Sequence, residues 1–151
     1  MRCASRLLSP SLIGLCFLAA CSGGGIPRHD SQQQLRDRYA NYAGPPLDGF
    51  TYLGRYDSWE SIGNNQLVVF TTPFDAYLVT VQGPCSDLNF VNTIGLTSTG
   101  NTVSSRLDSV KVKRQLCPIS EIRRVDYQKM KADMRVEADK AKADAAATKS
   151  P

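Results

Sequence analysis

The chain has 151 residues, which is enough for one domain with a modest core after a leader is removed. It carries 18 Lys and Arg against 14 Asp and Glu, and charges of opposite sign cancel over residues 21–120. Nucleic-acid binding requires a basic patch or stripe, so this balance excludes that class of partner.

Residues 1–20 have the order of a secretory signal. Arg2 and Arg6 supply positive charge, residues 12–18 are apolar, and small residues follow. The apolar run is shorter than the roughly 20 residues that span a bilayer. We therefore expect this segment to be a cleaved signal and not a membrane-spanning helix.

The signal ends at residues 18–21, Leu-Ala-Ala-Cys, which resemble the bacterial lipobox. The resemblance implies cleavage before Cys21 and attachment of acyl chains to it. Two or three chains hold a protein firmly on a lipid bilayer. Asp after the cysteine resembles an inner-membrane retention signal, and this chain has Ser22 instead. We expect a lipid-anchored protein of the bacterial envelope, on the periplasmic face of the outer membrane.

Five cysteines reduce to one pair in the mature chain. Cys3 and Cys16 leave with the signal, Cys21 is the lipid site, and Cys85 and Cys117 remain. In an oxidising periplasm these two predict a structural disulfide, worth about 3.5 to 4 kcal/mol for a loop of about 33 residues. The alternative is a redox-active pair, which would favour Cys-x-x-Cys spacing.

The next segments are a tether over residues 21–30, which holds the only histidine, His29, and a short helix and loop over residues 31–49. A capping box at residues 31–34 predicts a helix over 32–43, which Gly44 and two prolines end. Its apolar stripe is predicted to dock on the domain and consists of Leu35, Tyr39 and Tyr42.

Residues 50–125 predict a mainly β, disulfide-closed domain. The expected strands are 50–56, 66–71, 76–82, 89–97 and 102–113, with a last short edge segment over 116–125. Gly100-Asn101 predicts a two-residue hairpin turn. The spacing favours a small antiparallel meander, a barrel or sandwich of about six strands. Residues 67–70 and 77–79 are apolar at consecutive positions, which predicts cover on both faces.

Residues 126–151 form a charged, Ala-rich tail that is predicted to be helical. Met130 and Met134 begin a narrow apolar stripe at helical spacing. An isolated helix of this kind is marginally stable in water. It is interpreted as a solvated extension, or alternatively as a helix that seeks a partner.

The predicted domain lacks the known catalytic motifs and contains no histidine, so we expect no enzyme activity, cofactor or metal. A glycosidase-like pair among its carboxylates is the alternative; these are Asp57, Glu60, Asp75, Asp87 and Asp108. Tyr52, Tyr56 and Trp59 are a speculative binding surface for a glycan or a protein. Packing in the core and at its rim is the other interpretation.

Several short motifs in residues 50–125 resemble an uncharacterised family of small Gram-negative envelope proteins, a domain of unknown function often found behind a secretory or lipoprotein signal. The motifs are Trp59-Glu60-Ser61-Ile62, Tyr77-Leu78-Val79, Cys85 to Leu88, Asp108 and Cys117-Pro118-Ile119. The resemblance supports the disulfide and a single β domain, and implies no activity. It suggests a structural role for Asp108 in a turn or an ion pair.

Together these features predict a non-enzymatic periplasmic lipoprotein that binds an envelope protein as an accessory module. The alternatives are a periplasmic inhibitor of a lysozyme or protease, and a binder of a small ligand or glycan.

Overall fold

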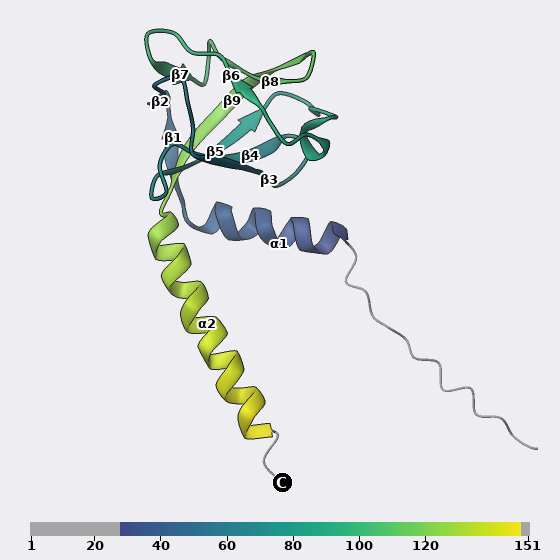
Figure 1. Ribbon diagram of the computed structural model, residues 1–151, viewed down its shortest axis with the longest axis vertical. Coiled ribbons are helices and arrows are strands. Elements are labelled where there is room, and N and C mark those ends of the chain that lie inside the picture. Colours follow the sequence, from purple (N-terminus) through teal and green to yellow (C-terminus); the bar gives the residue numbers. More distant parts are fainter. Residues whose placement is uncertain (1–27, 149–151) are drawn as a thin grey trace, which may run out of the picture.

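The computed structural model describes residues 28–148. The expected signal over residues 1–20, the lipid site Cys21 and most of the tether lie outside the described residues, as do residues 149–151. Within the described part, a β body stands above two helices (Figure 1).

The body is a curled antiparallel half-barrel, which confirms the predicted fold class. Its main sheet has the order β3-β4-β5-β9-β8-β6, with β1 also paired to β9, while β2 and β7 form a separate pair. The strands are β1 Ala43–Leu47, β2 Gly49–Thr51, β3 Ser58–Ser61, β4 Gln66–Phe70, β5 Ala76–Val81, β6 Gly95–Leu96, β7 Thr102–Ser104, β8 Ser109–Val112 and β9 Gln115–Val125; a 3-10 turn, η1, covers Leu88–Phe90.

The strand β9 is the centre of the sheet, so the prediction of a short edge segment was wrong. It pairs with β5 along one side and with β8 and then β1 along the other. Pro118 lies within β9, although proline is usually confined to sheet edges. Here Pro118 is the last residue paired to β8, and the pairing with β5 is irregular beside it. A missing N–H is tolerated at such a position.

Other boundaries also differ from the expectation. Pro45 and Pro46, predicted as loop, lie in β1, and the predicted strand 89–97 is mostly η1 and loop. The predicted strand 102–113 is divided into β7 and β8 by a turn. The Gly100-Asn101 turn is confirmed, with φ values of 59° and 61°. Two residues with positive φ are typical of a type I′ turn.

The strands β4 and β5 are covered on both faces, as their consecutive apolar residues predict. Alternate residues face the inside of the half-barrel and join one core cluster, which includes Leu67, Val69, Val79 and Ile122. The others form a second cluster with the helices: Tyr39, Val68, Leu78, Val125 and Met130. Side chains therefore divide between the two faces with the strand period of two.

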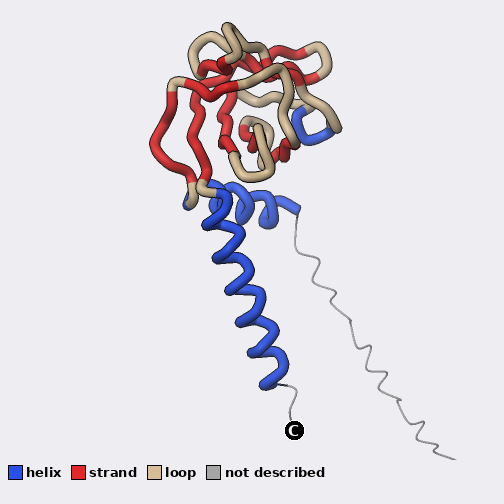
Figure 2. Tube along the Cα trace, turned by 60° about the vertical axis from the view of Figure 1, so that its left-hand side comes forward, coloured by secondary structure: helices blue, strands red, loops and turns tan. Residues whose placement is uncertain are grey.

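The helix α1, Arg28–Asn41, closes the second face (Figure 2). Its stripe docks on the sheet as predicted, with Tyr39 buried and Leu35 and Tyr42 packed beside it. The helix begins at Arg28, upstream of the predicted cap at Ser31, so the capping-box prediction was wrong.

The helix α2, Tyr127–Thr148, continues from β9 after one residue. Asp126 caps it by accepting a hydrogen bond at Oδ1 from the Lys129 backbone N–H at 3.1 Å. Tyr127 packs edge-on against Phe70, with ring centroids 4.8 Å apart, and Met130 is buried. Every residue from 135 to 148 is exposed, and α2 projects away from the body (Figure 1). Neither described helix is long and apolar enough to cross a bilayer.

Candidate functional site

Two residues of the predicted aromatic cluster, Tyr56 and Trp59, lie at the side of the half-barrel where a loop, and not a strand, covers β3. The Tyr56 hydroxyl donates to the Ile94 carbonyl oxygen at 2.8 Å, and Trp59 Nε1 approaches the Asn92 carbonyl oxygen at 3.4 Å. Ser61 on the same side donates to Asn89 Oδ1 at 2.5 Å. We call these contacts between residues 56–61 and residues 89–94 the closing seam. It joins β3 to the loop that leads to β6.

Tyr52, the third predicted aromatic residue, belongs to the core. It is 8% exposed, and burial raises the pKa of its hydroxyl. Tyr56 and Trp59 are half-buried, pack against the interior cluster and each line a hollow at the surface. Core and rim packing therefore describes all three side chains, and their role as a binding surface stays a prediction.

The expected disulfide is present between Cys85 and Cys117, with Cα atoms 6.0 Å apart. Both residues are buried. The bond joins the loop after β5 to the central strand β9. It thereby holds the start of the segment that forms the closing seam.

Asp108 is buried and stabilises a turn, as its resemblance to a family position suggested. Its Oδ1 accepts from the Thr97 hydroxyl at 2.8 Å and its Oδ2 accepts from the Ser104 backbone N–H at 2.7 Å. One carboxylate oxygen thus bonds the end of β7, and the other bonds the residue that follows β6. The structure gives this residue a local structural role.

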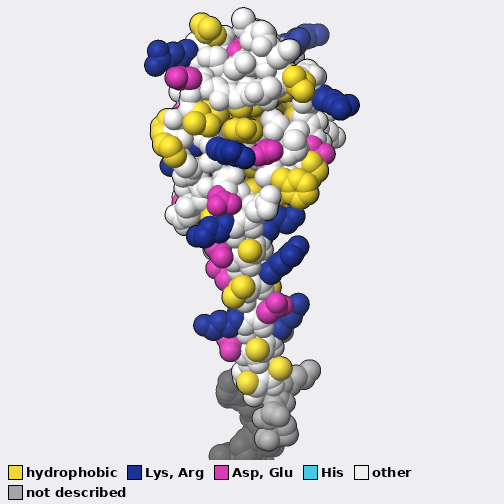
Figure 3. Space-filling view, turned by 90° about the vertical axis from the view of Figure 1, so that its left-hand side faces the viewer, with side chains coloured by type: hydrophobic (Ala, Val, Ile, Leu, Met, Phe, Trp, Pro, Cys, Tyr) yellow, Lys and Arg dark blue, Asp and Glu magenta, His cyan; other side chains and the backbone are white. Residues whose placement is uncertain are grey.

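An open groove of about 880 Å³ lies on the side of the body where β1 is the last strand. On the face of the molecule that contains it, hydrophobic side chains lie in a depression crossed by a basic and an acidic side chain (Figure 3). The lining comes from β1, β2, the β4–β5 turn, β5, the end of β9 and the start of α2. Residues distant in sequence therefore meet there.

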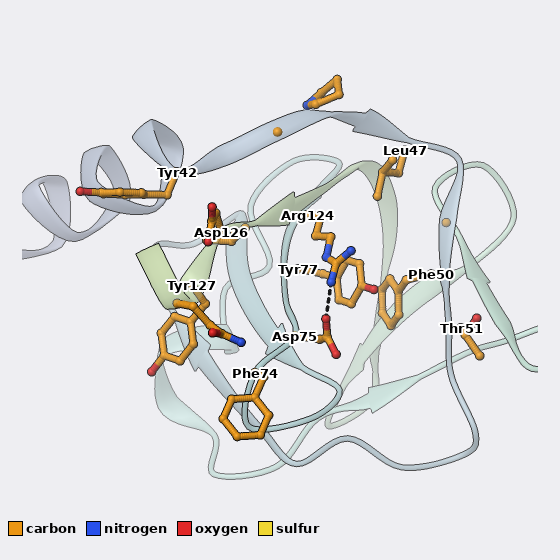
Figure 4. Close-up of a pocket in the computed structure, with 15 residues that line it drawn as sticks. Tyr42, Leu47, Phe50, Thr51, Phe74, Asp75, Tyr77, Arg124, Asp126 and Tyr127 are labelled. Carbon is orange, nitrogen blue, oxygen red and sulfur yellow. Dashed lines mark hydrogen bonds and ion pairs between the residues drawn. The ribbon is translucent and has the colours of Figure 1, made fainter. Parts of the chain in front are cut away.

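The floor of the groove is a pair of stacked rings. The ring centroids of Phe50 and Tyr77 are 4.5 Å apart and their planes differ by 14°. Beside them Arg124 Nη2 contacts Asp75 Oδ1 at 2.5 Å (Figure 4). Tyr77 and Arg124 are direct cross-strand partners in β5 and β9. Strand register therefore places an aromatic ring and a guanidinium side by side.

The rim of the groove carries Phe74, whose side chain is 66% exposed. The turn that carries Phe74 is stabilised by a threonine side chain. Thr72 Oγ1 accepts hydrogen bonds from the backbone N–H groups of Phe74 and Asp75 at 3.2 and 3.0 Å. The same hydroxyl donates to Asp75 Oδ2 at 3.0 Å. One short turn thus orients both the exposed ring and the carboxylate.

At the helical end of the groove, Tyr42 donates its hydroxyl to Asp133 Oδ2 at 2.7 Å. This hydrogen bond is the main reason that the pKa of Tyr42 is raised. On the covered face, burial and a hydrogen bond to Glu60 raise the pKa of Tyr39 far above its usual value. These tyrosines connect α1 to α2 and to the sheet.

The carboxylates that were candidates for a catalytic pair bind separate partners. Glu60 accepts from Tyr39, Asp75 pairs with Arg124, and Asp87 pairs with Lys113 at 3.1 Å. Within residues 28–148 no group of three or more His, Cys, Asp or Glu side chains has the arrangement of a metal site.

Sequence reasoning missed the residues that line the groove. Phe50 and Tyr77 were assigned to strands and Arg124 to the supposed edge segment, and no local pattern joins them. One signal was present, since Phe74 is an aromatic residue in the predicted loop over residues 72–75. Single exposed apolar side chains are common on protein surfaces, so this ring alone did not indicate a binding surface.

Comparisons with known proteins identify a family of unknown function. Residues 4–142 match a family of unknown function, DUF6491. No curated protein and no solved structure matches the chain. The match reaches well beyond the predicted residues 50–125 and includes α1 and most of α2. The chain therefore belongs to DUF6491, a family of unknown function.

Proposed function

We propose that this protein is a lipid-anchored accessory protein of the bacterial envelope, without catalytic activity, whose groove binds a segment of a protein partner. The observation that supports binding is the exposed Phe74 ring beside the apolar floor of Phe50 and Tyr77. Aromatic side chains at such sites contribute much of the energy of protein association. Separate pairing of the candidate carboxylates supports a function without catalysis.

Photo-crosslinking in living cells tests the binding. The photoreactive residue p-benzoyl-phenylalanine replaces Phe74 in the full chain, and the matched control places it at Phe90, which is 78% exposed on η1. A discrete adduct with one envelope protein from position 74, absent from position 90, is the expected result. Equal background from the two positions would contradict the proposal.

The identity of the adduct also decides between the proposed function and the alternatives from the sequence. A lysozyme or a protease at position 74, with loss of its activity, would replace the accessory role with inhibition. Retention on purified envelope glycan that disappears in Tyr56→Phe or Trp59→Ala would support a glycan binder instead.

The lipid anchor in this proposal is supported by the signal-like residues 1–20 and by Cys21. Metabolic labelling with palmitate should mark the wild-type chain and leave Cys21→Ser unlabelled. Fractionation of the envelope should find the label with the outer membrane. Labelling of Cys21→Ser equal to the wild type would remove the lipid anchor from the proposal.

A further inference from the structure

We infer that the side of the body formed by η1 and the β8–β9 hairpin lies against an anionic lipid bilayer, the one that holds the acyl chains of Cys21. This inference rests on the lipid anchor of the proposed function and adds the orientation of the body on the membrane. We call this side the membrane face, and its residues are Phe90, Lys111, Lys113, Arg114 and Leu116. The two apolar side chains enter the interfacial region of the bilayer and the basic side chains bind lipid phosphates.

The first step of the argument is the distribution of charge along the body. Residues 28–101 carry four arginines and no lysine against seven carboxylates, whereas residues 102–116 carry four basic side chains and one carboxylate. That carboxylate, Asp108, is buried and accepts hydrogen bonds at both oxygens. Three of the four basic residues lie within residues 111–114, at the end of β8 and in the turn before β9. The hairpin is therefore a basic region of an otherwise acidic body.

Two of the three basic side chains at the hairpin have no partner of opposite charge. Lys113 pairs with Asp87 at 3.1 Å, but Lys111 and Arg114 are exposed and make no ion pair within residues 28–148. Anionic lipids attract lysine and arginine near a bilayer surface, and each such side chain strengthens binding about fivefold. The two unpaired cations therefore favour an anionic lipid surface as the occupant.

Exposed apolar side chains accompany these charges. Phe90 is 78% exposed on η1 and Leu116 is 59% exposed on β9. Leu116 is the direct cross-strand partner of Lys111, and both point away from the interior cluster that their neighbours Val110 and Cys117 join. Apolar side chains beside basic ones are typical of protein surfaces that enter the interfacial region of a bilayer. The hairpin thus offers both kinds of contact at adjacent positions.

Two crosslinks hold η1 and the hairpin together. Asp87, the residue before η1, forms the ion pair with Lys113 in the hairpin turn. The disulfide between Cys85 and Cys117 joins the same two segments two residues earlier in the loop. Both elements lie on one side of the body, away from β1 and β2 (Figure 1). The membrane face is therefore a fixed surface and not a pair of independent loops.

The length of chain before α1 agrees with this orientation. The start of α1 at Arg28 lies on the same side of the molecule as η1 and the hairpin, in both Figure 1 and Figure 2. Cys21 is seven residues before Arg28, a separation that spans at most about 25 Å. A bilayer that holds Cys21 therefore lies within that distance of the start of α1. With the membrane face on this bilayer, the groove beside β1 and β2 faces away from the lipid and stays open to a partner.

Quenching of tryptophan fluorescence by lipids with brominated acyl chains tests the orientation. The full lipidated chain is reconstituted in vesicles of phosphatidylglycerol and phosphatidylcholine. Phe90→Trp reports on the membrane face, and the matched variant Phe74→Trp reports on the rim of the groove, where the native ring is 66% exposed. After subtraction of the wild-type signal from Trp59, quenching at position 90 should be at least about twice that at position 74.

Removal of the two unpaired cations tests the recognition of anionic lipid. Lys111→Gln with Arg114→Gln, added to Phe90→Trp, should weaken the oriented state about tenfold or more and abolish the stronger quenching at position 90. The matched control Arg55→Gln with Arg135→Gln removes two exposed arginines elsewhere and should retain it. Vesicles of phosphatidylcholine alone, or added salt, should act as the first pair of substitutions does.

The outcomes separate the inference from the proposed function. Equal quenching at the two positions, or stronger quenching at position 74, in a chain that palmitate labels would overturn the inference and leave the anchor in place. Stronger quenching at position 90 that persists in neutral vesicles would overturn the role of anionic lipid. An envelope protein crosslinked from position 90 would assign the face to a protein partner instead. Failure of the palmitate test at Cys21 would overturn the anchor itself.

Discussion

The closed and the open sides of the half-barrel both carry aromatic residues, but the polar atoms of these residues differ in their partners. At the closing seam, the Tyr56 hydroxyl and the Trp59 indole contact backbone carbonyls of Ile94 and Asn92. In the groove, the Tyr77 hydroxyl has no described partner and its ring stacks on Phe50. An aromatic residue whose hydroxyl or indole N–H bonds the protein itself has a structural role. One whose hydroxyl lacks such a partner is available to a ligand.

Strand pairing explains why only one side is open. β1 pairs with β9 alone, and the chain then turns away so that β2 pairs with β7. Gly49 permits the close approach of β2 to β7, because a Cβ atom there would overlap the Val103 carbonyl oxygen. Among the described residues no strand continues beyond β1, so the edge of the sheet borders the groove.

Removing the disulfide should have the largest effect, because the disulfide holds the segment that closes the barrel. We expect Cys85→Ala with Cys117→Ala to lower the free energy of unfolding by about 3.5 kcal/mol, since the unfolded chain regains the freedom of a loop of about 33 residues. Urea unfolding measures the loss. The reduced wild type is the control, and a loss under about 1 kcal/mol would show that the seam stands without the disulfide.

Truncating one large ring on each side should separate the two roles. Trp59→Ala should lower the free energy of unfolding by about 2 to 3 kcal/mol, because its half-buried ring packs on the core. Phe74→Ala should change it by less than about 0.5 kcal/mol, because that ring is mostly in solvent. Chemical denaturation of both variants gives the comparison. A larger loss for Phe74→Ala would reverse the assignment of roles.

Deleting single hydroxyl groups sharpens the same contrast. Tyr56→Phe removes a hydrogen bond to Ile94 and should lower the free energy of unfolding by about 1 kcal/mol. Tyr77→Phe removes a hydroxyl without a described partner and should leave the value unchanged within error. Paired urea titrations are sufficient. Equal losses would mean that the Tyr77 hydroxyl is also structural.

Alkaline pH should weaken the helix-covered face of the sheet, where Tyr39 is buried. The pKa of Tyr39 is raised by burial and by Glu60, while the unfolded chain titrates near the ordinary value of 10.0. Above that pH the unfolded state releases a proton that the folded state retains, so stability falls as pH rises. Melting curves between pH 9 and pH 11 should decline less steeply for Tyr39→Phe. Identical slopes would contradict this origin.

Shortening α2 should have the smallest effect. Residues 135–148 are all exposed, so a chain that ends at Ala138 should keep its free energy of unfolding within about 0.5 kcal/mol. Met130→Ala, in the docked first turns, is the contrasting variant and should lower the value by about 2 kcal/mol or more. A large loss on truncation would reveal a stabilising contact of the projecting part.

The parts of the fold that local patterns determine were predictable. Residues 67–70 and 77–79 are consecutive apolar runs, and they lie in β4 and β5, which are covered on both faces. The stripe of α1 docks where its spacing indicates. The prediction that residues 116–125 form an edge was wrong, because strands distant in sequence pair with β9 on both sides.

The groove was not predictable, because it depends on pairings between distant segments. Tyr77 meets Arg124 through the β5–β9 register, and Phe50 arrives from β2, which pairs with β7. Tyr56 and Trp59 drew attention because they are close in sequence. Because they are close along the chain, both lie in the closing seam. Closeness in sequence does not by itself expose their polar atoms to a ligand.

The direct continuation of β9 into α2 has a mechanical consequence. A partner that pulls on the projecting helix would load the central strand along its axis. Since β9 is paired on both sides, the hydrogen bonds to β5, β8 and β1 would share that load in shear and would not open one at a time. The docked first turn of α2 would yield before the sheet does. The molecule can therefore transmit tension through α2 while its central sheet keeps its strand pairing.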